Sequence, residues 1–119
     1  MAKLRIGIPT KKRAGLKDVV SEVFGKARTF TLVDVEDATI KKVRVIDNPA
    51  VSYPYGSGPV AVKTLADMKI NMVLTGELGL GASELLDHHK IKKIVVNPDM
   101  TVADSIREAF VKMKEKGEQ

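Results

Sequence analysis

Two glycine-rich turns could bind an anion, because each directly precedes a predicted helix. The first covers residues 56–59 with the sequence Gly-Ser-Gly-Pro, and the second covers residues 76–81 with Gly-Glu-Leu-Gly-Leu-Gly. Exposed backbone N–H groups at a helix start can hold a negatively charged group. Neither turn matches a phosphate-binding P-loop or a dinucleotide fingerprint, since the Lys-Ser/Thr ending and the Gly-x-Gly-x-x-Gly spacing are both missing. The turns therefore predict either a site for an anionic or metal-containing ligand or tight turns alone.

The two histidines, His88 and His89, are adjacent at the predicted end of a helix. Neighbouring helical positions point roughly 100° apart, so the pair lacks the i, i+4 spacing that chelates one metal ion. The histidines suit a surface role that complements the negative end of the helix dipole, with metal ligation or proton transfer as the alternative. Because the chain contains no cysteine, disulfides and cysteine-ligated clusters are excluded within it.

Hydrolytic chemistry has little support in the sequence. Two-metal nucleases need clustered carboxylates, and sites of the ribonuclease H type take one of them from the first strand. Residues 3–8 contain no acid, which leaves Glu77 and Asp104 without that partner. No serine lies in a nucleophile-elbow pattern that would indicate a catalytic triad. We therefore expect a protein that is not an enzyme.

The hydrophobic pattern predicts the elements that must position the glycine turns. Alternating or continuous apolar runs indicate five strands, at residues 3–9, 29–35, 39–46, 72–75 and 93–96. Helical spacing indicates three helices: one opened by Pro59, one over residues 80–89, and one that starts at Thr101, where Thr101 and Asp104 resemble a capping box. A short helical turn closed at Gly25 is expected within residues 21–27, and loops are expected at residues 10–19 and 48–58.

These elements follow the order β-β-β-α-β-α-β-α, which predicts an α/β fold with a mixed five-stranded sheet and flanking helices. The ribonuclease H-like fold has the same element order. The second and third strands should form a hairpin, and Lys41, Lys42 and Arg44 mark the third strand as a defended sheet edge. No domain boundary is visible, so residues 1–119 are expected to form a single domain with a charged, frayed tail from about residue 112.

Composition is that of a globular protein, with 44% hydrophobic and 29% charged residues in 119. The net charge of +5 lies in four short basic groups with acids interleaved, which predicts a mixed-charge surface. Aromatic residues make up only 4%, which argues against a surface that stacks bases. Salt-sensitive binding of nucleic acid through the basic groups is the less favoured alternative. No apolar run has the length of a membrane span and no signal peptide is visible, so we expect a cytoplasmic protein. One Gln and three Asn beside many lysines are compatible with a heat-adapted source.

Several short motifs, in order along residues 3 to about 110, resemble the dinitrogenase iron–molybdenum cofactor biosynthesis family. Residues 20–27, Val-Ser-Glu-Val-Phe-Gly-Lys-Ala, resemble its Ser-Glu-His-Phe-Gly-Arg-Ala signature. The likeness continues at Gly15-Leu16, Phe30, residues 32–35, Asn48-Pro49, residues 56–58, residues 72–79 and Ala82. The family has the ribonuclease H-like fold, in agreement with the element order.

Members of the family include nitrogenase accessory proteins that carry or insert the iron–molybdenum cofactor or its iron–sulfur precursor. The resemblance implies a non-covalent site for such an anionic cluster. By resemblance, the ligand-binding residues are Ser21, Phe24, Gly25, Lys26 and Arg28, with Gly56, Gly58, Gly76 and Gly79 close by.

One position departs from the family signature, because Val23 stands where the family has histidine. A valine cannot ligate a metal. For the site that the resemblance implies, two interpretations therefore remain: a carrier of an iron–sulfur or iron–molybdenum cluster, or an interaction or regulatory module that has lost the cluster site. Such a module would bind a small anion or a protein partner.

Overall fold

The computed structural model describes residues 3–115, with side chains to Lys114. Each predicted strand and helix is confirmed to within two residues at its predicted boundaries, and a short 3-10 helix, η1, lies in the first predicted loop. The elements are β1 (Lys3–Thr10), η1 (Gly15–Lys17), β2 (Thr29–Glu36), β3 (Thr39–Asp47), α1 (Ser57–Asp67), β4 (Met72–Thr75), α2 (Leu80–His88), β5 (Lys92–Val95) and α3 (Val102–Glu115).

The five strands form one mixed sheet in the order β3-β2-β1-β4-β5. β1, β2 and β3 pair antiparallel, whereas β4 pairs parallel with both β1 and β5. This confirms the predicted α/β class and the ribonuclease H-like arrangement. The order also places β3, with its three basic residues, at one edge of the sheet as expected.

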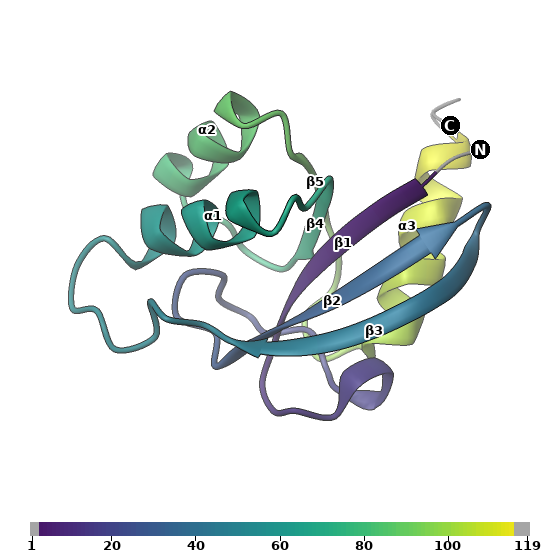
Figure 1. Ribbon diagram of the computed structural model, residues 1–119, viewed down its shortest axis with the longest axis horizontal. Coiled ribbons are helices and arrows are strands. Elements are labelled where there is room, and N and C mark those ends of the chain that lie inside the picture. The colour runs from purple at the N-terminus through teal and green to yellow at the C-terminus, as the bar shows by residue number, and fades with distance from the viewer. Residues whose placement is uncertain (1–2, 116–119) are drawn as a thin grey trace.

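Helices cover both faces of the sheet, α1 and α2 on one side and α3 on the other (Figure 1). Strand alternation divides the apolar residues between two cores. Phe30, Leu32 and Val73 face α1 and α2, while Ile6, Ile8 and Leu74 face α3. The two helical crossovers, through α1 and α2, leave the carboxyl ends of β3 and β4. Because β3, β1 and β4 run in the same direction, these loops lie at one end of the sheet, where ligands bind in open α/β sheets.

α3 begins with the predicted cap and contacts β5, the strand at the other edge of the sheet. The Thr101 hydroxyl accepts a hydrogen bond from the Asp104 N–H at 3.1 Å, which is half of a capping box. Near the other end, Lys112 Nζ donates to the Val95 carbonyl at 2.7 Å, so a lysine occupies an outward-facing acceptor of β5. The helix continues to Glu115, beyond residue 112 where the charged tail was predicted to begin, and residues 116–119 lie outside the described part of the chain.

The helical turn predicted within residues 21–27 is wrong, because this segment folds as bends and one turn. One backbone hydrogen bond forms the turn, from the Ala27 N–H to the Phe24 carbonyl at 3.3 Å. Asn48 instead holds the end of the segment from outside, because its side-chain amide donates to the carbonyls of Gly25 and Ala27, at 2.9 Å each. A side chain from a distant part of the sequence thus satisfies backbone groups of this loop.

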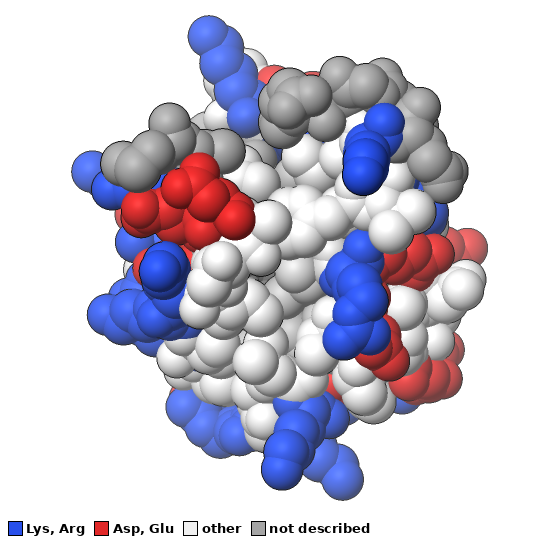
Figure 2. All heavy atoms as spheres, turned by 90° about the vertical axis from the view of Figure 1, so that its right-hand side faces the viewer, with Lys and Arg blue, Asp and Glu red and all other residues white. Residues whose placement is uncertain are grey.

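Charge is distributed as the composition predicts on the face that carries α3 and the β2–β3 turn. Figure 2 shows Lys and Arg side chains at the periphery of this face, several of them beside Asp or Glu, around a broad uncharged centre. Within residues 3–115, no helix is long and apolar enough to cross a membrane.

Candidate functional site

A groove of about 570 Å³ lies where α1 and α2 begin, beside the loop of residues 21–28. We call it the helix-start groove. Its volume is within the usual range for small-molecule sites, about 300–1,000 Å³. It is lined by Glu22, Val23, Phe24, Gly25, Lys26, Ser57, Gly58, Pro59, Glu77, Leu78, Gly79, Gly81 and Ala82.

Small residues bring the three walls of the groove together. A Cβ on Gly58 would lie 3.4 Å from the Ala82 Cβ, so α1 and α2 approach closely at their first turns. A Cβ on Gly25 would lie 2.8 Å from the Gly58 backbone nitrogen, a distance that real side chains do not adopt. Glycine at position 25 is therefore required for the loop to lie against the start of α1.

Both helix starts in the groove lack a side-chain cap, and neither first turn contains an acid. The first N–H groups of a helix have no partner within the helix, and they carry the positive end of its dipole. α3, which begins elsewhere, has Thr101 as a cap and Asp104 in its first turn. The two uncapped starts thus present backbone donors to whatever enters the groove.

Two glycines leave room that the fold itself does not use. A Cβ on Gly79 or on Gly81 would meet no atom within 4 Å. Neither residue has a positive φ, so backbone strain does not require glycine at these positions. There is therefore open space in the groove wall beside the turn before α2, at Gly79, and beside the first turn of α2, at Gly81.

Buried contacts hold the loop of residues 21–28 in place. Phe24 is buried and packs against Phe30, with ring centroids 5.4 Å apart. Asn48, 1% exposed, links this loop to the next one, because its Oδ1 also accepts the Ala50 N–H at 2.9 Å. Lys26 Nζ donates to the Tyr53 carbonyl at 3.0 Å, so its charge is fixed at the rim of the groove.

The groove contains charges of both signs. Lys26 is accompanied by two acids, Glu22 and Glu77. Glu22 lies 3.9 Å from Lys11 Nζ, which also donates to Asp99 at 2.5 Å. The hydrogen bond to Asp99 raises the pKa of Lys11, so Lys11 remains a cation beside Glu22 and offsets its charge.

The structure brings together five of the nine residues implied by the family resemblance. Phe24, Gly25, Lys26, Gly58 and Gly79 line the helix-start groove. The other four, Ser21, Arg28, Gly56 and Gly76, lie outside its lining.

Three of those four have structural roles in the loops around the groove. The Ser21 hydroxyl accepts the Val23 N–H at 3.3 Å, and its N–H donates to the Pro9 carbonyl, so Ser21 shapes its own loop. Gly56 has φ 73° at the start of α1, a conformation that favours glycine. The Arg28 carbonyl accepts the Asn48 N–H at 3.1 Å, while its side chain is exposed.

Gly76 belongs to a second hollow, the β5 groove, which has a volume of about 1120 Å³. It runs along the β5 edge between α2 and α3 and shares Glu22, Glu77 and Leu78 with the helix-start groove. Half of its lining residues come from β5, Lys92–Val95, and from residues 96–98. Although it is larger, it contains none of the helix starts and only one residue implied by the resemblance.

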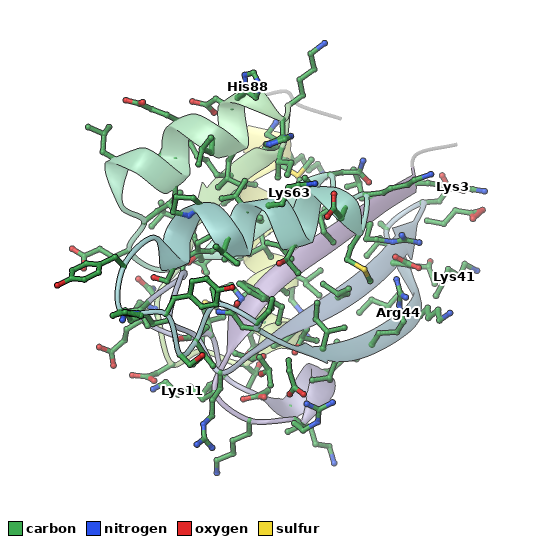
Figure 3. The ribbon with its side chains drawn as sticks, turned by 60° about the vertical axis from the view of Figure 1, so that its left-hand side comes forward. Lys3, Lys11, Lys41, Arg44, Lys63 and His88 are labelled. Carbon is green, nitrogen blue, oxygen red and sulfur yellow. The ribbon has the colours of Figure 1, made fainter. Side chains whose placement is uncertain are left out.

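The candidate metal ligands do not converge on either groove. His88 projects from the end of α2 (Figure 3), about 12 Å along the helix from Leu80 at 1.5 Å per residue. His88 and His89 contact each other edge to face, with ring centroids 5.3 Å apart. Within the described residues, no group of three or more His, Asp or Glu side chains could hold a metal ion. Val23, where the family signature has histidine, lines the helix-start groove and is 50% exposed.

Sequence reasoning missed several groove residues. Ser57, Pro59, Glu77, Leu78 and Gly81 belong to the two glycine turns, so their position in the sequence was a sufficient signal. Glu22 and Ala82 were part of the matching motifs but were not selected. Asn48 was noticed only as part of a motif, and its contact with Gly25 and Ala27 could not be read from spacing.

A family model described as dinitrogenase iron-molybdenum cofactor matches residues 2–112. One curated relative, an uncharacterised protein of Methanocaldococcus jannaschii, is 28% identical over 60 residues. That match covers 50% of this chain, and it spans 51% of the length of the relative.

Solved structures share the fold over nearly the whole chain. The apo form of the orange protein from Desulfovibrio gigas is 27% identical with a TM-score of 0.82, covering 92% of this chain and 88% of its own. A NifB-like protein from Thermotoga is also 27% identical, with a TM-score of 0.73 and the same coverage of 92% and 88%. A dinitrogenase-like protein from Methanocaldococcus jannaschii, 15% identical with a TM-score of 0.65, covers 99% of this chain and 93% of its own and shows the fold alone.

Proposed function

The chain belongs to the dinitrogenase iron-molybdenum cofactor family, and from this premise we propose that it is a non-enzymatic binding protein for an anionic metal cluster. The cluster, of the iron–molybdenum or iron–sulfur type, is cargo that the protein holds and releases. The helix-start groove is the proposed site. The observation that carries the proposal is the convergence of two uncapped helix starts on one groove.

The chemistry of the groove suits an anion held by hydrogen bonds. Backbone N–H groups at the starts of α1 and α2 supply donors, and the aligned helix dipoles favour negative charge there. Lys26 adds a full positive charge at the rim. The open space beside Gly79 and Gly81 gives a bulky ligand room to approach the backbone.

Side-chain ligation of a metal does not suit this groove. Val23 offers no donor atom at the position of the family histidine, and within the described residues no group of three or more His, Asp or Glu side chains could hold a metal ion. A cluster would therefore be bound through its own anionic atoms, without a metal–protein bond. Such binding is reversible, which is appropriate for cargo.

Val23 also favours a second candidate function: a module of the same fold that binds a small anion or a protein partner and has lost the cluster site. In this case, the helix starts would bind an oxyanion, and the cluster would not be retained. The two candidates differ in one measurable property, the affinity of the unmodified protein for the cluster.

The test is an anaerobic titration of the protein with isolated iron–molybdenum cofactor, followed by native mass spectrometry with metal analysis. We expect saturable binding that Lys26→Gln weakens by about tenfold, because a charged hydrogen-bond donor is lost. Lys63→Gln is the matched control, since Lys63 is an exposed lysine on α1 that pairs with Asp67 away from the groove (Figure 3).

The outcomes separate the two candidates. Equal affinities of Lys26→Gln and Lys63→Gln for the cofactor would show that the helix-start groove is not the binding site. A wild-type protein that refuses the cofactor, together with Val23→His that retains it, would establish the second candidate. Refusal by both proteins would reject cluster binding by this fold.

A further inference from the structure

Thr75 carries an unexplained hydroxyl at the carboxyl end of β4. The residue is 1% exposed, and its Oγ1 is buried with no hydrogen-bond partner among the described residues. A buried hydroxyl without a partner destabilises a fold, because it loses its bonds to water and gains none in return. Such an atom needs an explanation.

Other buried hydroxyls of the sheet and helices are satisfied. Thr10 bonds to the hydroxyls of Thr29 and Thr31, at 2.6 and 3.1 Å. Ser105 donates to the Val102 carbonyl at 2.7 Å. Packing in this protein therefore provides partners for buried hydroxyls elsewhere, and Thr75 is an exception.

Strand alternation directs Thr75 toward the face of the sheet that carries the helix-start groove. Val73 belongs to the core that faces α1 and α2, while Met72 and Leu74 belong to the core that faces α3. Thr75 follows Val73 by two residues on β4, so its side chain points to the α1 and α2 side. Phe24, Gly58 and Ala82, which line the groove, lie on this same side.

Thr75 also lies at the correct end of the strand. It is the last residue of β4, and Glu77, two residues later, is the first groove residue of the turn before α2. Thr75 does not itself line the groove. The turn that follows it in the sequence contains Gly79, which has open space beside it. Because Thr75 is 1% exposed, this turn has to move slightly for an anion in the groove to reach the hydroxyl.

We propose that Thr75 is a ligand-binding residue whose hydroxyl donates a hydrogen bond to the anion at the inner end of the helix-start groove. This inference rests on the proposed function and adds a side-chain donor to its backbone donors. The hydroxyl is kept unpaired in the free protein and gains its partner only when the anion is bound. The unpaired hydroxyl destabilises the free protein. It also makes the site selective, because a ligand without an acceptor atom at this depth would leave the hydroxyl unpaired.

Two substitutions separate a binding role from a structural role. Thr75→Val keeps the shape and removes the hydroxyl, whereas Thr75→Ser keeps the hydroxyl and removes a methyl group. If the hydroxyl serves the ligand, Thr75→Val melts at or above the wild-type temperature, and Thr75→Ser melts below it. In the same case, Thr75→Ser binds nearly as well as the wild type, and Thr75→Val binds about tenfold more weakly.

Binding is measured with two probes, isolated iron–molybdenum cofactor under anaerobic conditions and sodium molybdate, a small tetrahedral oxyanion. Molybdate binding is followed by the amide NMR shifts of residues 57–58 and 80–82. A Thr75→Val protein that binds both probes like the wild type overturns the inference. So does a Thr75→Val protein that melts below Thr75→Ser, because the hydroxyl would then stabilise the fold.

The two probes distinguish this inference from the proposed function. Molybdate binding that depends on the hydroxyl, without retention of the cofactor, supports the inference and rejects the cluster carrier. Cofactor binding that Thr75→Val leaves unchanged supports the carrier and rejects the inference. A wild-type protein that binds neither probe overturns both.

Discussion

Glycines in the helix-start groove serve two opposite purposes. Gly25 lies so close to the Gly58 nitrogen that any side chain would collide with backbone, so the fold requires it. Gly81 faces open space with an ordinary backbone conformation, so the fold does not. Glycine is thus required by the fold in one wall of the groove, whereas in another wall it only leaves space that a ligand could occupy.

This difference predicts opposite effects of the same substitution. Gly81→Ala should stabilise the protein by about 0.4–1 kcal/mol, because alanine reduces the freedom of the unfolded chain. Gly25→Ala should destabilise it by about 1–3 kcal/mol through overpacking. Chemical denaturation measures both values. A loss of stability in Gly81→Ala would show that the space beside it is not open.

Residue types alone indicated part of the site. Phe24, Gly25 and Lys26 were identified from a contiguous motif and line the groove together. Ser21 and Arg28, from the same stretch, do not line it, since the bends of the loop direct their contacts to Val23, Pro9 and Asn48. Thr75 gave no signal in the sequence, because the absence of a partner for its hydroxyl is a property of the packed fold.

At the scale of elements, hydrophobic periodicity predicted every strand and α-helix in the described chain. It failed at residues 21–27, where a helical turn was expected and bends are found. Local composition favoured the turn, but the bonds that decide this conformation come from Asn48 and from the contact of Gly25 with α1. Interactions over twenty residues or more are not visible in local patterns.

Asn48 is therefore expected to position the loop of residues 21–28 for binding. Asn48→Ala removes both amide donations and the acceptor for Ala50, and it leaves buried backbone groups unpaired. We predict a loss of stability of about 2–3 kcal/mol and weaker binding of the cofactor. Thermal unfolding and the anaerobic titration measure the two effects.

The control is Asn97→Ala, because Asn97 is exposed in the β5 groove. A change of less than about 0.5 kcal/mol is expected there. If Asn48→Ala were as stable as Asn97→Ala, the other contacts of the loop would be enough to hold it, and the link through Asn48 would not matter.

At the scale of the whole molecule, the topology determines where the two helix starts lie. β3 and β4 run in the same direction, because β3 is related to β1 by two antiparallel pairings and β4 pairs parallel with β1. The loops that follow β3 and β4 and lead to α1 and α2 therefore lie at one end of the sheet. α1 and α2 then lie on the same face and begin beside each other (Figure 1). The element order predicted only that helices flank the sheet. The right hand of almost all crossover connections explains why α1 and α2 share one face.

The helix-start groove and the β5 groove meet at this end of the sheet, and we propose that the cluster binds in the smaller one, the helix-start groove. The β5 groove has twice the volume but lacks helix starts, and Lys112 already occupies a carbonyl of its edge strand. The central claim is therefore that the cluster binds in the helix-start groove.

Amide NMR spectra of the protein, recorded with and without isolated iron–molybdenum cofactor, test that claim most directly, because iron broadens the signals of nearby nuclei. The account predicts selective broadening at residues 23–26, 57–58 and 79–82, with residues 88–89 and 92–95 unaffected. Broadening centred on β5 or on the two histidines would contradict it.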